Sequence, residues 1–583
     1  MYVCLMGLVA ILCLYMHSLY HAVSGSMLSK NKRPYDVDDL PPRKRLLHNV
    51  RDIWANNLLP SSRVQELLND AADAGASGCR SMRRPATGNN TARNLRRAYL
   101  KRNQWPSLYL CSVRVKHPKS GEECVEQLAF MLPHESIEVL ARLGDPTVLQ
   151  ARLGMDPKSQ QHLESCEAKA GCQLVGVGLW GDGVPCNWDR TESAECFSVN
   201  LPGQAKDYKG LRLPVTTLSR KMIGPHTWHD IMEVIAWSFR HLAAGVWPLK
   251  RHDGSDFSKA DARRAKSAGQ PLGIRGALVE VRGDWKMFAE VFGFPKWNNS
   301  AGLCWRCNCT LDQITDVGSN ASWRRTRTTH WELIAKIRAN GAKLSPLLQA
   351  PWVTNEIFRV DWLHAADQGV TADWLGHVFK LLLTKLPGNT LNERASALWS
   401  QIRAFYQAGA VQDRLQNLQY TMIQQPQKAA KLRASGAQVR ALVPFAAEAA
   451  NRLLNTGGLV DEAARAGTNH LAKCYGALSN DSIHAVDTLK ESSMRFALQY
   501  VSLRNAHADD PKAWRIKPKL HMFLELCSEG SHPAKFWNYR DEDWGGSVAR
   551  MARRRGGELH ALTFSTNVLS RFKVQQPVIR MKA

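Results

Sequence analysis

The stretch Leu174-Val-Gly-Val-Gly-Leu-Trp180 is the best guide to the fold, because this short apolar run ends at Gly181-Asp182-Gly183. Apolar runs of about 4–8 residues bounded by glycine are typical of buried strands. Such a strand would carry Asp182 at its end. We therefore predict a buried strand that presents a carboxylate where it leaves the core.

The next segments continue a mixed α/β pattern. Cys196–Leu201 and Leu211–Leu218 are predicted as two further strands. Pro225–Gly245 is predicted as a helix, because apolar residues recur near a 3.6-residue period. Thr227 and Asp230 form a start that resembles a capping box. These elements favour one α/β core built around the first strand.

A fourth predicted strand, Ile274–Arg282, is followed by Asp284. The resulting order of strand, strand, strand, helix and strand is that of a ribonuclease-H-like core. Two acids lie near the ends of the first and fourth strands of such a core, here Asp182 and Asp284. We therefore predict an α/β fold with a ribonuclease-H-like mixed sheet.

Composition indicates a folded protein with a polyanionic partner. The 583 residues are too many for one simple core, and contents of 44% hydrophobic and 22% charged residues are ordinary for globular proteins. The net charge of +25, from 77 Lys+Arg against 52 Asp+Glu, favours nucleic acid. An anionic membrane surface or a solubilising surface charge are the alternatives.

Cysteine usage indicates a reduced intracellular protein. The 14 cysteines are scattered, without the dense framework of a disulfide scaffold. Random placement of this number would give about 0.3 Cys-x-x-Cys pairs. One such pair therefore gains weight only from the motifs around it.

Asp182, Asp284 and Glu542 are the candidate catalytic residues and ligands for two Mg²⁺ or Mn²⁺ ions. Carboxylates hold such hard ions, which align and neutralise the oxygens of a phosphodiester during cleavage. Taken singly, the three residues also fit a turn, a helix N-cap and a solvated surface acid. Asp541 and Asp543 flank the third residue, so the last acid could be any of these three.

Cys304 and Cys307, two residues apart, form a candidate structural zinc site together with Asp361 and His364. Thiolate and imidazole suit Zn²⁺, and Asp361 would either be the fourth ligand or orient His364. Cys309 is a possible replacement ligand. The alternative is a pair of ordinary buried thiols with a helix-capping aspartate. His521 is interpreted as a satisfied core histidine.

Two arginine groups are candidate phosphate contacts, with Trp305 and Trp323 near the first group as candidates for stacking on a base. The alternative is a solvated basic face. The candidate nucleic-acid-binding residues are Arg324, Arg325, Arg327, Arg553, Arg554 and Arg555, with Arg550 beside the second group.

In this order, the motifs resemble those of CACTA (En/Spm-type) DNA transposases and their Plavaka and KDZ relatives over roughly residues 170–560. The resemblance implies a ribonuclease-H-like fold with an all-α insertion before the last acid, and a DDE-type metal cage. One departure is Ala366, where the family usually has an acid, and no N-terminal zinc finger is visible. The matching motifs are Asp182-Gly183, Gly283-Asp284, Cys304-x-x-Cys307, Asp361-x-x-His364 and Trp537-Asn-Tyr-Arg-Asp-Glu542.

The predicted division of the chain has five parts. A helical insertion is expected because strand signals disappear and Ala, Leu, Arg and Gln recur at helical spacing. The parts are 1–100, an apolar N-terminus and a basic, disordered leader; 101–169, an α/β lead-in; 170–330, the first part of the core with the zinc knuckle; 331–515, the helical insertion; and 516–583, the return to the core with the last acid and a basic C-terminal segment.

The N-terminal region carries two conflicting targeting signals. Residues 1–24 are apolar enough for a signal peptide or a membrane anchor. Lys30-Asn-Lys32-Arg33 and Arg43-Lys44-Arg45 instead resemble a bipartite nuclear localisation signal, which agrees with the rest of the chain. A further basic stretch, a candidate DNA-contacting arm, comprises Arg84, Arg93, Arg96, Arg97, Lys101 and Arg102.

These observations predict a nuclear, transposase-like DNA nuclease and strand-transferase that acts through two divalent ions. DNA is the expected partner, a homo-oligomer is possible, and no small-molecule substrate is implied. One alternative is a catalytically inactive domesticated derivative that binds DNA or protein. Another is a secreted or membrane-anchored protein, which depends on residues 1–24 alone.

Overall fold

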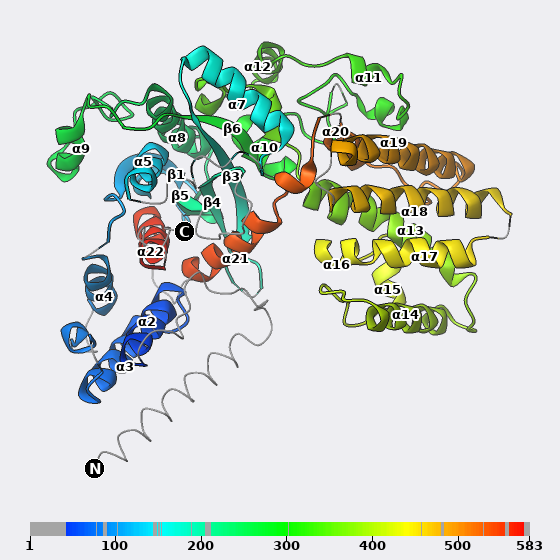
Figure 1. Cartoon of the computed structure of the whole chain (residues 1–583), viewed down its shortest axis with the longest axis horizontal. Helices are drawn as coiled ribbons and strands as arrows, with labels where there is room; N and C mark the ends of the chain where they lie inside the picture. Colours follow the sequence, from blue (N-terminus) through cyan, green and yellow to red (C-terminus); the bar gives the residue numbers. More distant parts are fainter. Residues whose placement is uncertain are drawn as a thin grey trace.

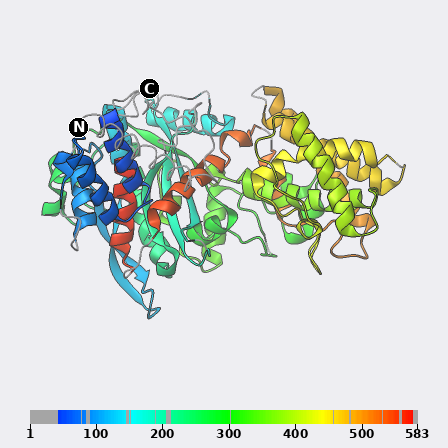
Figure 2. The same ribbon diagram turned by 90° about the horizontal axis from the view of Figure 1, so that it is seen from below.

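The computed structural model describes residues 42–575, except for gaps at 77, 85–89, 102, 144–148, 150–151, 153, 188, 204–211, 301, 456, 480–482, 529 and 554–558. A mixed sheet with covering helices forms the centre (Figure 1). A small group of N-terminal helices and a large helical region lie on opposite sides of this centre in both views (Figure 2).

The central sheet has five strands in the order β5-β4-β3-β6-β7. β3 pairs antiparallel with β4, β4 pairs antiparallel with β5, and β6 is parallel to both β3 and β7. This confirms the predicted ribonuclease-H-like mixed sheet with a large helical region. The strands are β3 (Val175–Pro185), β4 (Ser193–Asn200), β5 (Leu213–Ser219), β6 (Gly276–Arg282) and β7 (Phe358–Arg359).

The glycines of β3 are required by close packing on both faces of the sheet. A Cβ atom on Gly178 would lie 2.1 Å from Oδ1 of Asn200 and 2.9 Å from Oε1 of Glu280. A Cβ atom on Gly181 would lie 2.5 Å from the ring of Phe197. The alternation of glycine with large apolar residues therefore allows polar and aromatic side chains of neighbouring strands to lie across β3.

Helices cover both faces of this sheet. On one face, Leu242 of α8 (Thr227–Ala244) lies against Gly276, and Met287 of α10 (Trp285–Phe292) lies against Gly181. On the other face, Leu163 of α7 (Pro157–Ala170) lies against Gly176, and Trp544 of α21 (Tyr539–Ala552) stacks edge-on against Trp180. Glu542 therefore reaches the sheet on the face opposite α8.

A chain of buried charges attaches α21 to the sheet. Nε of Arg212 donates to Oδ1 of Asp541 at 3.0 Å, and Nη1 of Arg282 donates to Oδ2 of the same carboxylate at 3.1 Å. Arg282 also pairs with Glu280 at 2.5 Å. These four side chains are all buried. Asp541 is thereby committed to two guanidinium groups, which fixes the start of α21 over β6.

A lead-in region precedes the sheet. It contains the hairpin β1 (Tyr109–Lys116) and β2 (Glu123–Phe130), followed by α5 (Pro133–Leu143). α22 (Ala561–Gln575), the last described helix, packs against β2 and β5. The two ends of the described chain therefore meet beside the sheet.

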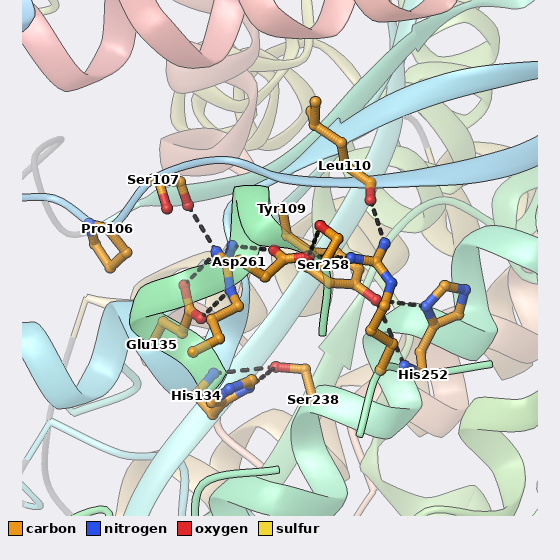
Figure 3. A network of polar contacts seen from close by, with 12 residues as sticks. Pro106, Ser107, Tyr109, Leu110, His134, Glu135, Ser238, His252, Ser258 and Asp261 are labelled. Atoms are coloured by element: carbon orange, nitrogen blue, oxygen red, sulfur yellow. Dashed lines mark hydrogen bonds and ion pairs between the residues drawn. The ribbon is translucent and has the colours of Figure 1, made fainter. Parts of the chain in front are cut away.

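The segment between α8 and β6 is held to the lead-in region by a buried polar network (Figure 3). Nε and Nη2 of Arg264 donate to the two carboxylate oxygens of Glu135 at 2.6 and 2.9 Å. Nη1 of Arg264 donates to Asp261 at 2.9 Å, and the hydroxyl of Tyr109 bonds Nδ1 of His252 at 2.7 Å. The network joins η5 (Lys259–Asp261) and α9 (Ala262–Ser267) to β1 and α5.

The helical region follows β7. It begins with the π-helical η9 (Leu363–Thr371), and β7 itself lies in the sheet although sequence placed residues 358–359 in the insertion. Two residues are too few for a strand pattern to be visible in sequence. The remaining helices are α13 (Ala372–Leu383), α14 (Leu391–Ala408), α15 (Tyr420–Ile423), α16 (Gly436–Ala441), α17 (Val443–Leu453), α18 (Leu459–Leu478), α19 (Ile483–Ala506) and α20 (Lys519–Leu526).

The prediction of a disordered leader is wrong for residues 42–100 where they are described. α2 (Pro42–Ala55), α3 (Ser61–Asp73) and α4 (Thr91–Leu100) pack around a small core of their own. Trp54 and Leu68 belong to this core, as does Val574 from the other end of the chain. The composition of residues 1–100 did not reveal this core, because one of its buried residues, Val574, comes from α22 far along the sequence.

Only part of the predicted targeting signals falls on described residues: the second basic cluster, Arg43-Lys44-Arg45, lies in the first turn of α2. Residues 1–24, the first basic cluster and Arg102 lie outside the described residues. Among the helices that the structure describes, none combines the length and the apolar character needed to cross a membrane. The nuclear location remains a prediction.

Replacement of Asp541 by Asn should destabilise the protein, although it removes no proposed metal ligand. The change leaves Arg212 and Arg282 with a neutral partner in a buried site, and breaking a buried ion pair costs about 3–5 kcal/mol. Urea denaturation should show a lower midpoint. Asp487→Asn, at an exposed position in α19, is the control and should change stability by less than about 0.5 kcal/mol. Equal midpoints for both variants would contradict the role of Asp541.

Candidate functional site

Three side chains from distant parts of the chain converge at one end of β3. Asp182 belongs to β3, His364 to η9 and Glu542 to the first turn of α21. One carboxylate oxygen of each acid and one ring nitrogen of His364 all lie within 4.8 Å of one another. All three residues are partly buried. This group, called the acidic site below, can hold a metal ion.

Asp284 lies next to the acidic site, at the end of the adjacent strand β6. Its Oδ1 accepts a hydrogen bond from the backbone N–H of Met287 at 2.6 Å, so it is also the N-cap of α10. A cap uses one carboxylate oxygen and leaves the other for a second partner. Burial is the main cause that raises the pKa values of Asp182 and Glu542, and the negative charge of Asp284 adds to the rise at both carboxyl groups.

The structure distinguishes the three consecutive acids at 541–543. Asp541 is fully buried and paired with two arginines, while Asp543 is exposed. Glu542 points to Asp182, and its Oε1 is buried without a hydrogen-bond partner among the described residues. Glu542 is therefore the acid of this run that belongs to the acidic site.

Asp361 holds His364 in place. Oδ2 of Asp361 lies 2.5 Å from Nδ1 of His364 and accepts the backbone N–H of the same residue at 3.0 Å. Its Oδ1 accepts the backbone N–H groups of Leu363 and Asn538, both at 3.1 Å. Because Nδ1 is engaged, Nε2 is the ring nitrogen available to the acidic site. Of the two sequence-based roles for Asp361, the orienting one matches this geometry.

A break in η9 shapes this segment. Gly369 has non-helical φ and ψ angles of −103° and −107°. A Cβ atom there would lie 2.9 Å from the carbonyl oxygen of His364 and 2.8 Å from the side chain of Lys519. Nζ of Lys519 donates to that same carbonyl oxygen at 2.7 Å. π-Helical turns often mark functional sites, and here glycine leaves room for a lysine to satisfy the carbonyl next to the site.

Crowded negative charge dominates the electrostatics. Burial raises the pKa of Asp182 well above its ordinary value, and the charges of Glu542 and Asp284 raise it further. Burial likewise raises the pKa of Glu542, to about 7. Burial would lower the pKa of His364, but the hydrogen bond and charge of Asp361 reverse this and raise it. A divalent cation would relieve this repulsion.

The acidic site fits a hard divalent cation. Mg²⁺ and Mn²⁺ prefer carboxylate oxygens, and Glu542 supplies a buried oxygen without a partner among the described residues. An imidazole beside the carboxylates is compatible with Mn²⁺ or with contact to a substrate. The donor set therefore matches the predicted cation, with His364 as an addition that sequence did not indicate.

A second cluster, called the cysteine site, contains Cys304, Cys307, His521 and Glu525, whose ligand atoms all lie within 4.8 Å of one another. All four residues are buried. Sγ of Cys307 lies 3.3 Å from Nε2 of His521, and the backbone N–H of Arg306 donates to Sγ of Cys304 at 3.3 Å. This buried group can bind a metal such as zinc.

Cys309 and Glu525 differ as candidates for the fourth position. Both carboxylate oxygens of Glu525 accept bonds from Arg327, at 2.8 and 3.0 Å. Although burial opposes ionisation, Arg306 and Arg327 lower the pKa of Glu525 to about 2. Cys309 is fully buried, and its thiol donates to the carbonyl of Thr310 at 3.5 Å. Glu525 thus lies within the cluster but is paired with arginine, while Cys309 is a nearby sulfur outside the group of four.

The cysteine site favours a thiolate. Although burial opposes ionisation, hydrogen bonds from Cys307 and His521 lower the pKa of Cys304 to about 5. Burial disfavours the charged imidazole, but the hydrogen bond and charge of Cys304 raise the pKa of His521 to about 10. Thiolate and imidazole are the ligands that zinc prefers. Donor chemistry and burial therefore both fit a structural zinc ion.

The sequence-based grouping of the zinc ligands needs correction. Cys304 and Cys307 lie together, but Asp361 and His364 lie at the acidic site and His521 joins the cysteines. Chain order suggested the wrong histidine, because α20 returns from the helical region to the cysteine loop. The apolar surroundings of His521 indicated burial, which is correct, but burial does not separate a core histidine from a ligand.

The arginines of the first group, Arg324, Arg325 and Arg327, donate hydrogen bonds to carboxylate and carbonyl oxygens of the protein itself. Arg327 is paired with Glu525, Arg324 donates to the carbonyl of Gly318 at 2.9 Å, and Arg325 donates to that of Asn320 at 2.9 Å. Trp305 and Trp323 are buried, so neither is exposed for stacking on a base.

The second arginine group is only partly described. The backbone carbonyl of Arg553 accepts a bond from Asn57 at 2.8 Å, whereas Arg554 and Arg555 lie outside the described residues. Arg550 donates to Ser547 at 3.0 Å. The candidate phosphate contacts of this group therefore remain predictions.

No protein-family model and no curated protein matches the chain. Functional conclusions therefore depend on the geometry of the two sites.

The purified protein should contain about one zinc ion per chain, and His521→Ala should lose it. Removal of one of four ligands opens the closed shell that structural zinc requires. His364→Ala is the matched control and should keep its zinc, because that side chain lies at the acidic site. His521→Cys restores a zinc ligand and should retain the metal. Elemental analysis of the three variants would contradict this assignment if His364→Ala lost zinc and His521→Ala kept it.

Without divalent cations, the protein should lose stability as pH rises from about 4.5 to 7. Folded Glu542 holds its proton up to a pKa of about 7, whereas the unfolded group releases it near 4.5. The folded state then binds more protons across this window, so the free energy of unfolding falls as pH rises. Thermal unfolding in EDTA should show a smaller fall for Glu542→Gln than for wild type. An unchanged slope, equal to that of Asp487→Asn, would rule out this contribution.

Proposed function

We propose that the protein is a transposase-like DNA nuclease and strand-transferase that uses divalent metal ions. The observation that carries this proposal is the convergence of Asp182, His364 and Glu542, with Asp284 at the neighbouring strand end. These residues come from β3, η9, α21 and the end of β6. A carboxylate cluster at the sheet supports phosphodiester chemistry, since carboxylates can hold the divalent ions that such a reaction uses.

Two Mg²⁺ or Mn²⁺ ions bound by Asp182, Asp284 and Glu542 would neutralise the charge of the phosphodiester and of its leaving oxygen. In cleavage, a water oxygen forms a bond to phosphorus as the bond to the 3′ oxygen breaks. The water proton leaves to solvent or a nearby base, and the 3′ oxygen takes up a proton. In strand transfer, a 3′-hydroxyl replaces water as the nucleophile.

His364 is the group placed to bind or move a proton at this site. Asp361 fixes the ring through Nδ1 and thereby leaves Nε2 toward the carboxylates. In the neutral ring Nε2 can accept a proton, and in the charged ring it can donate a hydrogen bond to a phosphate oxygen. Its raised pKa favours the charged ring in the metal-free site. The pair Asp361–His364 is therefore assigned to the reaction rather than to zinc.

We assign a structural zinc ion to the cysteine site. Cys304 and Cys307 lie in the loop after α10, and His521 lies on α20 at the return from the helical region. An ion shared by these residues would link the core to that region. Burial of all its candidate ligands supports a closed structural role rather than a catalytic one.

Replacement of Asp182 by Asn should reduce Mg²⁺-dependent DNA cleavage by at least about 100-fold, because changes outside the ligand shell alone cost about 10–100-fold. DNA binding in EDTA should persist, since it depends on Lys and Arg contacts to phosphate. Asp487→Asn is the matched control and should cleave normally. Cleavage and salt-titrated binding assays on both variants provide the measurement.

Undiminished cleavage by Asp182→Asn would remove this residue from the reaction. A wild-type protein that binds DNA but cleaves under no divalent-ion condition would instead support the inactive, domesticated derivative.

A further inference from the structure

α4 carries a basic stripe that the proposed catalytic site does not use. Arg93, Arg96, Arg97 and Lys101 lie on one side of the helix, because their positions fall within about 140° at 100° per residue. Leu95 projects from the opposite side and is 1% exposed. Arg93, Arg97 and Lys101 are exposed and Arg96 is half-buried, while Leu100, which falls within the same arc, packs against the small core of the N-terminal helices. The stripe is therefore an exposed basic surface at the rim of that core.

The charges of the stripe have no ion-pair partner among the residues that the structure describes. Among the described residues, no carboxylate pairs with Arg93, Arg96, Arg97 or Lys101. Burial lowers the pKa of Arg96, and the neighbouring charges of Arg97 and Arg93 lower it further. α3 differs, since its Arg63 pairs with Glu66 at 2.6 Å. An ordinary solvated helix mixes both signs of charge in this way, whereas the α4 stripe does not.

α4 is held firmly against the rest of the molecule. The ring of Tyr99 packs on Trp54 with centroids 5.3 Å apart, and Leu95 enters the same small core. Just beyond the helix, the side-chain amide of Asn103 donates to the carbonyl of Lys573 in α22 at 2.6 Å. The stripe is therefore a fixed surface rather than a loose arm.

The same N-terminal helices also contact the helix of the last acid. The side-chain amide of Asn57 donates to the carbonyl oxygens of Arg550 and Arg553, at 3.2 and 2.8 Å. Arg550 lies in α21, two turns after Glu542. Figure 1 shows α2, α3 and α4 beside α21 and α22, on the side of the sheet away from the helical region. The stripe thus has a defined position relative to the acidic site.

We propose that the α4 stripe binds the phosphate backbone of duplex DNA outside the cleavage site. Arg93 to Lys101 spans about 12 Å at about 1.5 Å per residue, and a duplex carries one charge per about 1.7 Å of its axis. The stripe can therefore contact several phosphates at once. The choice of DNA over other polyanions depends on the proposed function, while the surface itself does not.

A membrane surface fits the stripe less well than nucleic acid does. Helices that lie on membranes present large apolar side chains beside their basic residues. The exposed residues next to the stripe are Ala92, Asn94 and Ala98. Arginine also forms bidentate bonds with phosphate, which suits a run of backbone phosphates.

The test compares two triple variants in the full chain. Arg93→Gln/Arg96→Gln/Arg97→Gln removes three charges from α4. The control Arg403→Gln/Lys428→Gln/Lys473→Gln removes three exposed charges from the helical region. Binding of labelled 30-base-pair DNA is measured in EDTA over a range of salt concentrations, so that cleavage plays no part. Thermal unfolding checks that both variants fold.

We expect the α4 variant to lower the slope of log affinity against log salt by about 2–3, since each phosphate contact contributes about 0.9. Its affinity near 0.15 M salt should fall at least about tenfold, and the control should change the slope by less than about 1. Equal losses in both variants would overturn the proposal in favour of bulk charge. So would an absence of duplex binding by wild type, or a larger loss of binding to RNA stems or anionic vesicles than to DNA.

This experiment separates the two proposals. If the α4 variant bound DNA no more weakly than the control while the wild type showed Mg²⁺-dependent cleavage, the stripe proposal would be rejected and the nuclease proposal retained. If the α4 variant bound DNA more weakly but the wild type never cleaved DNA, the stripe proposal would be retained and the nuclease proposal rejected.

Discussion

The buried ion chain Arg212–Asp541–Arg282–Glu280 is the constraint on which the acidic site depends. α21 returns to the sheet only after the long helical region, so no local sequence keeps Glu542 near Asp182. The carboxylate of Asp541 accepts bonds from both arginines, and an unpaired charge in that place would be costly. These ion pairs therefore set both the position of α21 and its rotation about its own axis. A residue that takes no part in chemistry decides where the neighbouring acid points.

The active geometry also depends on an irregular backbone. On the observed backbone, a Cβ atom at position 369 would lie 2.9 Å from the carbonyl oxygen of His364, so only glycine fits there without a shift. Gly369 leaves room for Lys519, whose Nζ donates to this carbonyl oxygen at 2.7 Å. Asp361 then orients the imidazole through two bonds. Several independent contacts therefore hold this irregular segment in one arrangement.

Sequence was sufficient for features with a local signature and insufficient for those created by distant contacts. The apolar runs of β3 and β6 and the acids that follow them were visible, because each run and its acid are neighbours in sequence. β3 itself continues past Asp182 to Pro185, where it pairs with β4. His521 takes the place beside the cysteines that sequence order gave to His364, and His364 lies at the acidic site instead, since sequence order does not show which loop each helix reaches. The folded α2–α4 unit was missed because Val574 completes its core. The two-residue β7 has no pattern long enough to detect.

Helix α20 connects the two metal-binding clusters. Lys519, at its first turn, donates to the carbonyl of His364 beside the acidic site, and His521, two residues later, contacts Cys307. Adjacent side chains of one short helix therefore touch both clusters. A closed zinc shell would fix α20 against the cysteine loop, and the same helix would then hold the segment that carries His364. A metal ion at the cysteine site would thus stabilise the acidic site through a single short helix, since α20 contacts both clusters.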